Sequence, residues 1–260
     1  MNPKIKTIIF DVGGVLIDID FKKSIDALRK AGFKDIEKKI HEISSDDHFT
    51  QYRLGLISTE EFRNFIRKEI DKAIKNIWLH NICTDYGNGY LIKEASLQCS
   101  LYHHLQNELN PLLQQNQLYI YPEFYFKELK FFADLVIVEM DMALEKTWLS
   151  EKMTDIAAII ELKYDSGNAI STSDYIKTDM PKLREYVRWL NYDCQYYFGV
   201  IYENDCEWLH WFDKRSTNNW ANGRLTELNA GYLGETMYFE VNSYNNMNFQ
   251  QKRTPCNVVF

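Results

Sequence analysis

An aspartate and a glutamate in the middle of the chain lie at the ends of two short apolar runs. The runs, residues 133–138 and 156–160, have the length and the β-branched content of buried strands. Asp134 lies at the start of the first run, and the second is followed by Glu161 and, two residues later, Lys163. If the two strands form a hairpin, we expect Asp134 to meet Glu161 at one edge of a sheet. Since alternate side chains share a face of a strand, Glu161 and Lys163 should point the same way.

A hard divalent cation suits two carboxylates and an ammonium group at the end of paired strands. Mg²⁺ is held by one or two carboxylates together with substrate phosphates. A lysine beside it can orient or deprotonate an attacking water and stabilise the developing charge. The alternative is that these are ordinary charged side chains at solvated strand ends, and the residues alone do not decide between the two. The sequence therefore predicts a candidate metal site for Mg²⁺ or Mn²⁺.

The pattern Asp134…Glu161-x-Lys163 resembles the core of the PD-(D/E)xK nuclease superfamily, which has the restriction-endonuclease-like fold. The resemblance covers about residues 76–215, and Ala133 stands where many members have proline. It implies an α/β fold with an α-β-β-β-α-β core. It also implies a metal-dependent nuclease that hydrolyses phosphodiester bonds in nucleic acid, with DNA as the expected partner.

Two more residues are assigned to this site by the resemblance. The segment 90–109 has an apolar stripe typical of a helix, which we expect Pro111 to end. In the superfamily such a helix often carries a glutamate that assists the metal, and Glu94 is the candidate. Glu123, in the aromatic strand expected at 118–126, could also face the site. The alternative for Glu94 is a solvated side chain on an amphipathic helix.

A second helix is expected at 174–190. The superfamily's second core helix often directs a Lys or Gln at the active site, and Lys182 matches that position, with solvated charge as the alternative. Pro181 suits the first turn of a helix, so the regular helix could begin only near Asp179. Further strands are expected at 194–203, 207–213 and 236–244, and the Asn-rich C-terminal tail is expected to hold little regular structure.

The N-terminal segment carries a different motif. An apolar strand is expected at 4–10, and Asp11 follows it, before a turn that contains two glycines. Helices are expected at 21–31, at 36–44, and from a capping box formed by Ser58 and Glu61. This segment resembles the start of a haloacid-dehalogenase-like (HAD-like) hydrolase, in which Asp11 would be the nucleophile.

The later motifs of a HAD-like hydrolase are not found in the sequence. No strand ends in a suitable Ser or Thr, and neither a partner lysine nor an acidic pair at a strand end is evident. A phosphoaspartyl mechanism needs all of these groups at one sheet edge. We therefore expect two domains, a truncated HAD-like segment at 1–72 and a nuclease-like domain at 73–260, with Asp11 as a relic rather than a nucleophile.

The charge of the chain argues against a nuclease. The formal net charge is −7. Residues 1–72 hold 14 Lys and Arg against 13 Asp and Glu, whereas residues 73–260 hold 16 against 24. A protein that binds nucleic acid without sequence preference usually has a basic face. An acidic nuclease domain would have to gather its Lys and Arg locally, or use bound metal to offset its carboxylates.

Three hypotheses follow for the function. The main one is a metal-dependent nuclease, the second is a nuclease-fold module that no longer cuts and serves in binding or regulation, and the third is a HAD-type phosphatase that uses Asp11. Five scattered cysteines without C-x-x-C spacing predict reduced thiols in the cytoplasm. We expect no membrane span and no signal peptide, because the apolar runs are too short. The sequence does not give the oligomeric state.

Overall fold

The structure is a computed structural model with two compact units, Met1–Phe65 and Ile66–Phe260. The boundary expected near residue 72 lies within one continuous helix, α4 (Thr59–Asn76). The division into domains at 1–72 and 73–260 therefore stays a prediction. The structure describes residues 21–30, 48–166, 172–190, 194–205, 221, 223–245 and 248–259.

Several expected features lie outside the described residues. Asp11 is among them, together with the strand expected at 4–10, the helix expected at 36–44 and the strand expected at 207–213. The expectation that Asp11 is a relic of a nucleophile therefore stays a prediction.

The described part of the first unit is helical. It contains α1 (Phe21–Lys30), α3 (His48–Arg53) and the start of α4. The capping box is present, because Ser58 Oγ accepts the N–H of Glu61 at 3.2 Å and the Glu61 carboxylate accepts the N–H of Ser58 at 2.8 Å. Phe62 is buried and packs against the rings of Phe49 and Tyr52. This aromatic contact joins α3 to α4.

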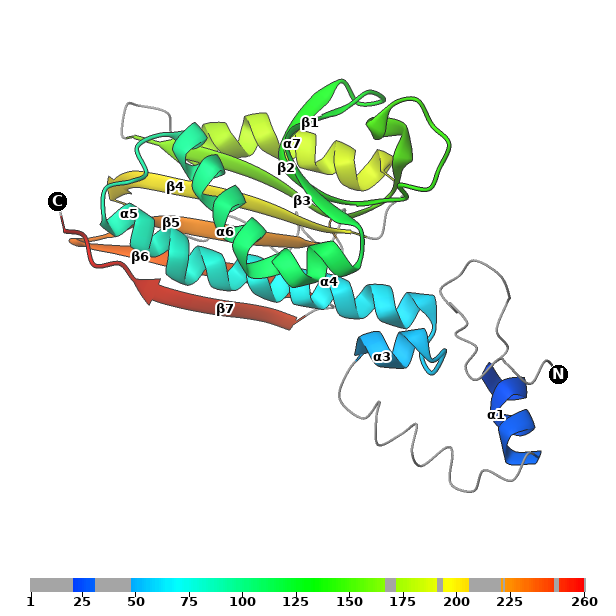
Figure 1. Ribbon diagram of the computed structural model, residues 1–260. Coiled ribbons are helices and arrows are strands. Elements are labelled where there is room, and N and C mark those ends of the chain that lie inside the picture. The colour runs from blue at the N-terminus through cyan, green and yellow to red at the C-terminus, as the bar shows by residue number, and fades with distance from the viewer. Residues whose placement is uncertain are drawn as a thin grey trace. The chain divides into compact units, whose positions relative to one another are not determined.

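The second unit is built on one seven-stranded sheet whose strands lie in chain order (Figure 1). The first three strands pair antiparallel, the third, fourth and fifth pair parallel, and the last three pair antiparallel again. Helix α7 (Thr172–Trp189) lies between β3 and β4 in the chain, which allows these two strands to run parallel. The strands are β1 (Leu118–Phe126), β2 (Phe131–Met140), β3 (Met153–Asp165), β4 (Gln195–Asp205), β5 (Leu225–Leu233), β6 (Thr236–Asn245) and β7 (Asn248–Pro255).

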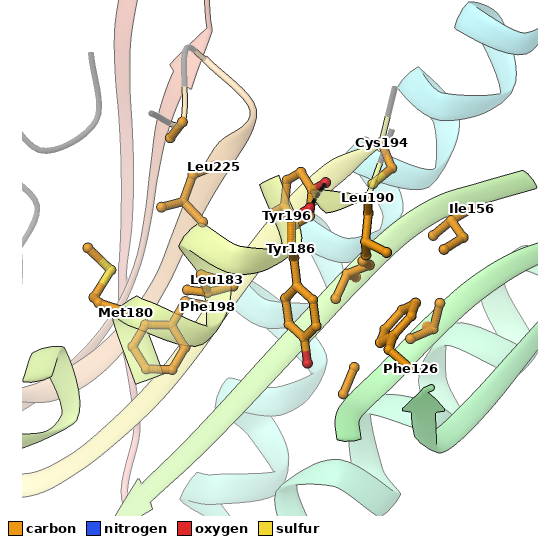
Figure 2. Packing of buried hydrophobic residues seen from close by; sticks show 14 of the residues in the cluster. Phe126, Ile156, Met180, Leu183, Tyr186, Leu190, Cys194, Tyr196, Phe198 and Leu225 are labelled. Carbon is orange, nitrogen blue, oxygen red and sulfur yellow. Dashed lines mark hydrogen bonds between the residues drawn. The ribbon is translucent and has the colours of Figure 1, made fainter. Parts of the chain in front are cut away.

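Helix α7 covers one face of the sheet. Its residues Leu183 and Tyr186 are fully buried in a cluster with Phe126, Ile156 and Phe198, which come from β1, β3 and β4 (Figure 2). Burying large apolar and aromatic side chains of this kind stabilises a fold by roughly 1.5–3 kcal/mol each. The cluster therefore fixes α7 firmly against the strands that carry the candidate site.

The helices before β1 cover the opposite face. α6 (Glu94–Gln115) packs against β1, β2 and β3, and the π-helical turn η1 (Ile77–Ile82) packs against β6 and β7. Trp78 of η1 is fully buried and donates its indole N–H to Asn229 O at 3.1 Å. A Cβ on Gly199 would lie 2.7 Å from Leu162 Cδ2 and 3.3 Å from the Trp78 ring. Gly199 is therefore required for Trp78 to approach β4.

Two prolines lie inside helices that we expected them to limit. α6 continues beyond Pro111, because Leu113 extends its buried stripe of leucines by another turn. α7 begins at Thr172 rather than near Asp179, and Pro181 lies inside it. Each proline removes one backbone N–H from the helix. Packing of the apolar face outweighs that loss in both helices.

The C-terminal part of the chain contains more sheet than its composition indicates. The strand expected at 236–244 is β6, but β5 and β7 flank it, so the tail is not irregular as expected. A short helix, α5 (Cys83–Gly87), follows η1. The expected α/β class is confirmed. Within the described ranges, no helix is long and apolar enough to cross a membrane.

Candidate active site

The hairpin expected between the two apolar runs is present. β2 and β3 pair antiparallel with Leu135 opposite Ile160, so Asp134 and Glu161 occupy the next pair of positions. Asp134 Oδ2 accepts the backbone N–H of Leu162 at 2.5 Å. This hydrogen bond directs the aspartate side chain toward β3 and brings it beside Glu161.

Two side chains of α7 contact the Glu161 carboxylate, which is fully buried. Lys182 Nζ donates to Oε2 at 2.5 Å, and the Tyr186 hydroxyl donates to Oε1 at 2.9 Å. Lys182 and Tyr186 are four residues apart, so they lie on one face of the helix. The packing of α7 on the sheet thus sets the position of both hydrogen-bond donors.

Burial raises the pKa of both site carboxyls. The pKa of Glu161 is raised to about 8, first by burial and then by the charge of Asp134, while Lys182 and Tyr186 oppose the rise. The pKa of Asp134 is raised to about 6, again first by burial, and the Leu162 N–H and Lys163 oppose it. Burial disfavours the ionised form of both carboxyls. The positive charge of a bound cation would favour the ionised form of both.

Lys163 is held at the rim of the site by α6. Its Nζ donates to Glu94 Oε2 at 3.1 Å, and the two side chains are 22% and 44% exposed. Glu94 therefore reaches the site through Lys163. Its charge also acts on Asp134, whose pKa it raises further.

Gln98 connects α6 to both strands of the first hairpin. Its Nε2 donates to the backbone oxygen of Asp134 at 2.7 Å and to Glu123 Oε1 at 2.8 Å. Glu123 lies opposite Asp134 on β1, with a positive φ of 49° that is uncommon for residues other than glycine. Pro122 precedes it in an edge strand, where proline removes no sheet hydrogen bond. Asp134 of β2 therefore lies beside a local distortion of β1.

The donor set suits a cation held by two carboxylates. Asp134 Oδ1 has no hydrogen-bond partner in the part of the chain that the structure describes, so it is open to a ligand. No group of three or more His, Cys, Asp and Glu among the described residues is arranged to hold a metal. Glu94, paired with Lys163, is therefore not in such a group with Asp134 and Glu161. Mg²⁺ needs only one or two protein carboxylates, since waters and substrate phosphates complete its coordination.

All five residues expected at the site lie in one neighbourhood: Asp134, Glu161, Lys163, Glu94 and Lys182. Tyr186 and Gln98 were not assigned to it from the sequence. Each lies four residues after an assigned residue on the same helix, Tyr186 after Lys182 and Gln98 after Glu94. This spacing was the available signal for both.

Comparison with known proteins gives one partial match. A D-ribitol-5-phosphate phosphatase of Bacteroides thetaiotaomicron is 37% identical over 80 residues, which are 29% of this chain and 39% of the relative. The chain thus matches well under half the length of that curated relative. No family model matches the chain. No solved structure matches it significantly.

The match changes the functional assignment. It agrees with the resemblance of the N-terminal segment to a HAD-like hydrolase, and with Mg²⁺ as the expected cofactor, because HAD phosphatases use Mg²⁺. The expectation of a nuclease with nucleic acid as its partner is wrong, since the relative is named for a small sugar phosphate. The acidic charge of residues 73–260 had already argued against a nucleic-acid partner.

Proposed function

We propose that this chain is a Mg²⁺-dependent hydrolase that acts on a phosphate ester of a small molecule. The observation that carries the proposal is the buried carboxyl of Glu161 beside the partly buried carboxyl of Asp134, flanked by the ammonium groups of Lys163 and Lys182. The match to a D-ribitol-5-phosphate phosphatase supports a phosphate ester of a small molecule as the substrate.

In this proposal the two carboxylates hold the cation. When bound, Mg²⁺ would polarise the phosphate and lower the pKa of a coordinated water. Lys182 and Tyr186 fix the orientation of Glu161, because each occupies one of its oxygens. Lys163, at the rim, places a positive charge where an incoming phosphate would lie, and Glu94 holds that ammonium group in position.

Asp11 is the alternative catalytic centre for the same reaction. The resemblance of the N-terminal segment to a HAD-like hydrolase makes it a candidate nucleophile, and the phosphatase match supports that resemblance. The missing later motifs argue against it. The two centres make different predictions, because Asp11→Asn would remove the nucleophile and leave the Asp134–Glu161 pair intact.

The test is phosphate release from p-nitrophenyl phosphate and D-ribitol 5-phosphate, with Mg²⁺ or with EDTA. The parent protein should be active only with Mg²⁺. Glu161→Gln and Asp134→Asn should abolish activity, and Lys182→Met should lower it by roughly 10- to 100-fold, as for residues that orient metal ligands. Glu128→Gln, which replaces an exposed glutamate of the same unit, is the matched control and should stay active.

Three results would overturn the proposal. Activity lost in Asp11→Asn and retained in Glu161→Gln would move catalysis to the N-terminal segment. Cleavage of bis(p-nitrophenyl) phosphate without any cleavage of monoesters would show that the substrate is a phosphodiester. Full activity in EDTA would show that the reaction does not need a metal ion.

We also propose a restriction-endonuclease-like core for the second unit. The order α6, β1, β2, β3, α7, β4 matches the expected α-β-β-β-α-β arrangement and supports this proposal. A fold of this kind does not decide the substrate, which is set by the site. The cytoplasmic location expected from the cysteines stays a prediction as well.

A further inference from the structure

Two cysteines that are far apart in the sequence lie in contact. Cys83 is the first residue of α5, and Cys256 follows β7, 173 residues later. Cys256 Sγ lies 3.1 Å from the backbone oxygen of Cys83, and Cys83 Sγ lies 4.0 Å from the backbone oxygen of Pro255. Both are free thiols, and both residues are 7% exposed. The sequence spacing gave no indication of this pair.

The backbone holds the two segments together independently of the thiols. Cys256 donates its N–H to Met237 O at 2.8 Å, and Val259 donates its N–H to Gly87 O at 3.0 Å. A Cβ on Gly87 would lie 2.4 Å from Asn257 O, so only glycine allows this approach. The proximity of the thiols is thus fixed by both flanking segments.

The environment differentiates the two sulfurs. The pKa of Cys256 is lowered, first by a hydrogen bond with the Cys83 thiol and also by the backbone N–H of Gly87. The pKa of Cys83 is raised by the same hydrogen bond and by burial. Cys256 is therefore the sulfur of the pair that ionises more readily, and the thiolate is the nucleophile in thiol chemistry.

We propose that Cys83 and Cys256 form a reversible disulfide when the protein is exposed to a peroxide. The Cys256 thiolate attacks the peroxide, so that an S–O bond forms, the O–O bond breaks, and the leaving hydroxide takes up a proton to become water. The Cys83 sulfur then attacks the sulfenic sulfur of Cys256. The S–S bond forms, the S–O bond breaks, and the Cys83 proton leaves with the second oxygen as water. The two sulfurs are oxidised by two electrons and one peroxide is reduced.

The disulfide would fasten the C-terminal segment covalently to α5. In the reduced protein this segment is held by backbone hydrogen bonds and by packing. Cross-linking removes freedom from the unfolded chain, and the effect grows with the length of the enclosed loop. The oxidised protein should therefore unfold at a higher temperature than the reduced protein.

The test is peptide mapping without reduction. The reduced full-length protein is treated with hydrogen peroxide, its remaining thiols are alkylated, and it is digested with trypsin. Cleavage after Lys75, Lys93 and Arg253 places Cys83 in peptide 76–93 and Cys256 in peptide 254–260. We expect these two peptides to appear joined, and dithiothreitol to separate them.

Variants and an internal control make the result decisive. Cys83→Ser and Cys256→Ser should each abolish the joined species, and Cys99→Ser, which replaces an exposed cysteine, should not. Oxidation of Cys99 in the same sample shows that peroxide reached the protein. Oxidised Cys99 together with unlinked peptides 76–93 and 254–260 in the parent protein would overturn the proposal. So would equal melting temperatures for the peroxide-treated and reduced parent proteins.

Discussion

Replacing Glu161 by glutamine should stabilise the metal-free protein, and the gain should increase with pH. The pKa of Glu161 is raised from 4.5 to about 8 in the folded protein. The folded state therefore binds the proton more tightly than the unfolded state. The stability linked to this proton is fully present below about pH 4.5 and is lost as the pH rises through about 8.

The size of the effect follows from the shift. One pKa unit corresponds to about 1.4 kcal/mol, so most of the penalty, about 4 kcal/mol, should develop between roughly pH 5 and pH 9. Glutamine keeps the shape of the side chain and has no charge to bury. Its variant should lack this part of the pH dependence.

The assay is urea denaturation in EDTA at several pH values, followed by the fluorescence of the six tryptophans. Glu128→Gln, at an exposed position, should give a curve parallel to that of the parent protein. Excess Mg²⁺ should stabilise the parent protein at high pH and stabilise Glu161→Gln much less, because the variant offers the cation one carboxylate instead of two. If the difference between Glu161→Gln and the parent protein does not change with pH, the Glu161 carboxylate is ionised throughout and the reasoning is refuted.

Three further substitutions probe the second unit. Arg253→Met should lower the free energy of unfolding by about 3 kcal/mol, because it leaves the buried Glu240 carboxylate without its ion-pair partner; urea denaturation measures this loss, and Lys252→Met, at an exposed neighbouring position, should cost little. Gly199→Ala should lower the melting temperature, at a cost of about 1–3 kcal/mol, because its Cβ would lie 2.7 Å from Leu162 Cδ2. Tyr186→Phe should cost about 1 kcal/mol and raise the pKa of Glu161 further, since the hydroxyl no longer donates to the carboxylate; an unchanged stability profile against pH would contradict this role.

The hairpin of the candidate site was predictable because its local signals agree. Two β-branched runs of strand length, with charged residues at their ends, led directly to Asp134 beside Glu161. The residues that the two helices contribute to the site were harder to predict from the sequence. Tyr186 and Gln98 reach the site only because α7 and α6 pack on opposite faces of the sheet, and that packing depends on residues distributed over the whole unit.

β5 escaped prediction because its polar residues are buried. Glu227 and Asn229 are fully buried, and Asn229 donates to the Glu227 carboxylate at 2.9 Å. Asn242 of the neighbouring strand donates to the same carboxylate at 3.3 Å. Side chains that satisfy one another across strands can line a sheet interior, but their composition is typical of a loop. The substrate could not be predicted from the site residues, because the same carboxylates and lysines suit any phosphate ester.

The burial of Trp78 has a consequence for the synthesis of this chain on the ribosome. The oxygen that accepts its indole N–H belongs to Asn229, which is made 151 residues later. At a rate of about 5–20 residues per second, the two residues are added roughly 8–30 seconds apart. During that interval Ile77, Trp78 and Ile82 lack β6 and β7, the strands against which η1 packs. The nascent chain thus presents an apolar helix that chaperones can bind, and a ribosome that stalls before β5 would leave it exposed.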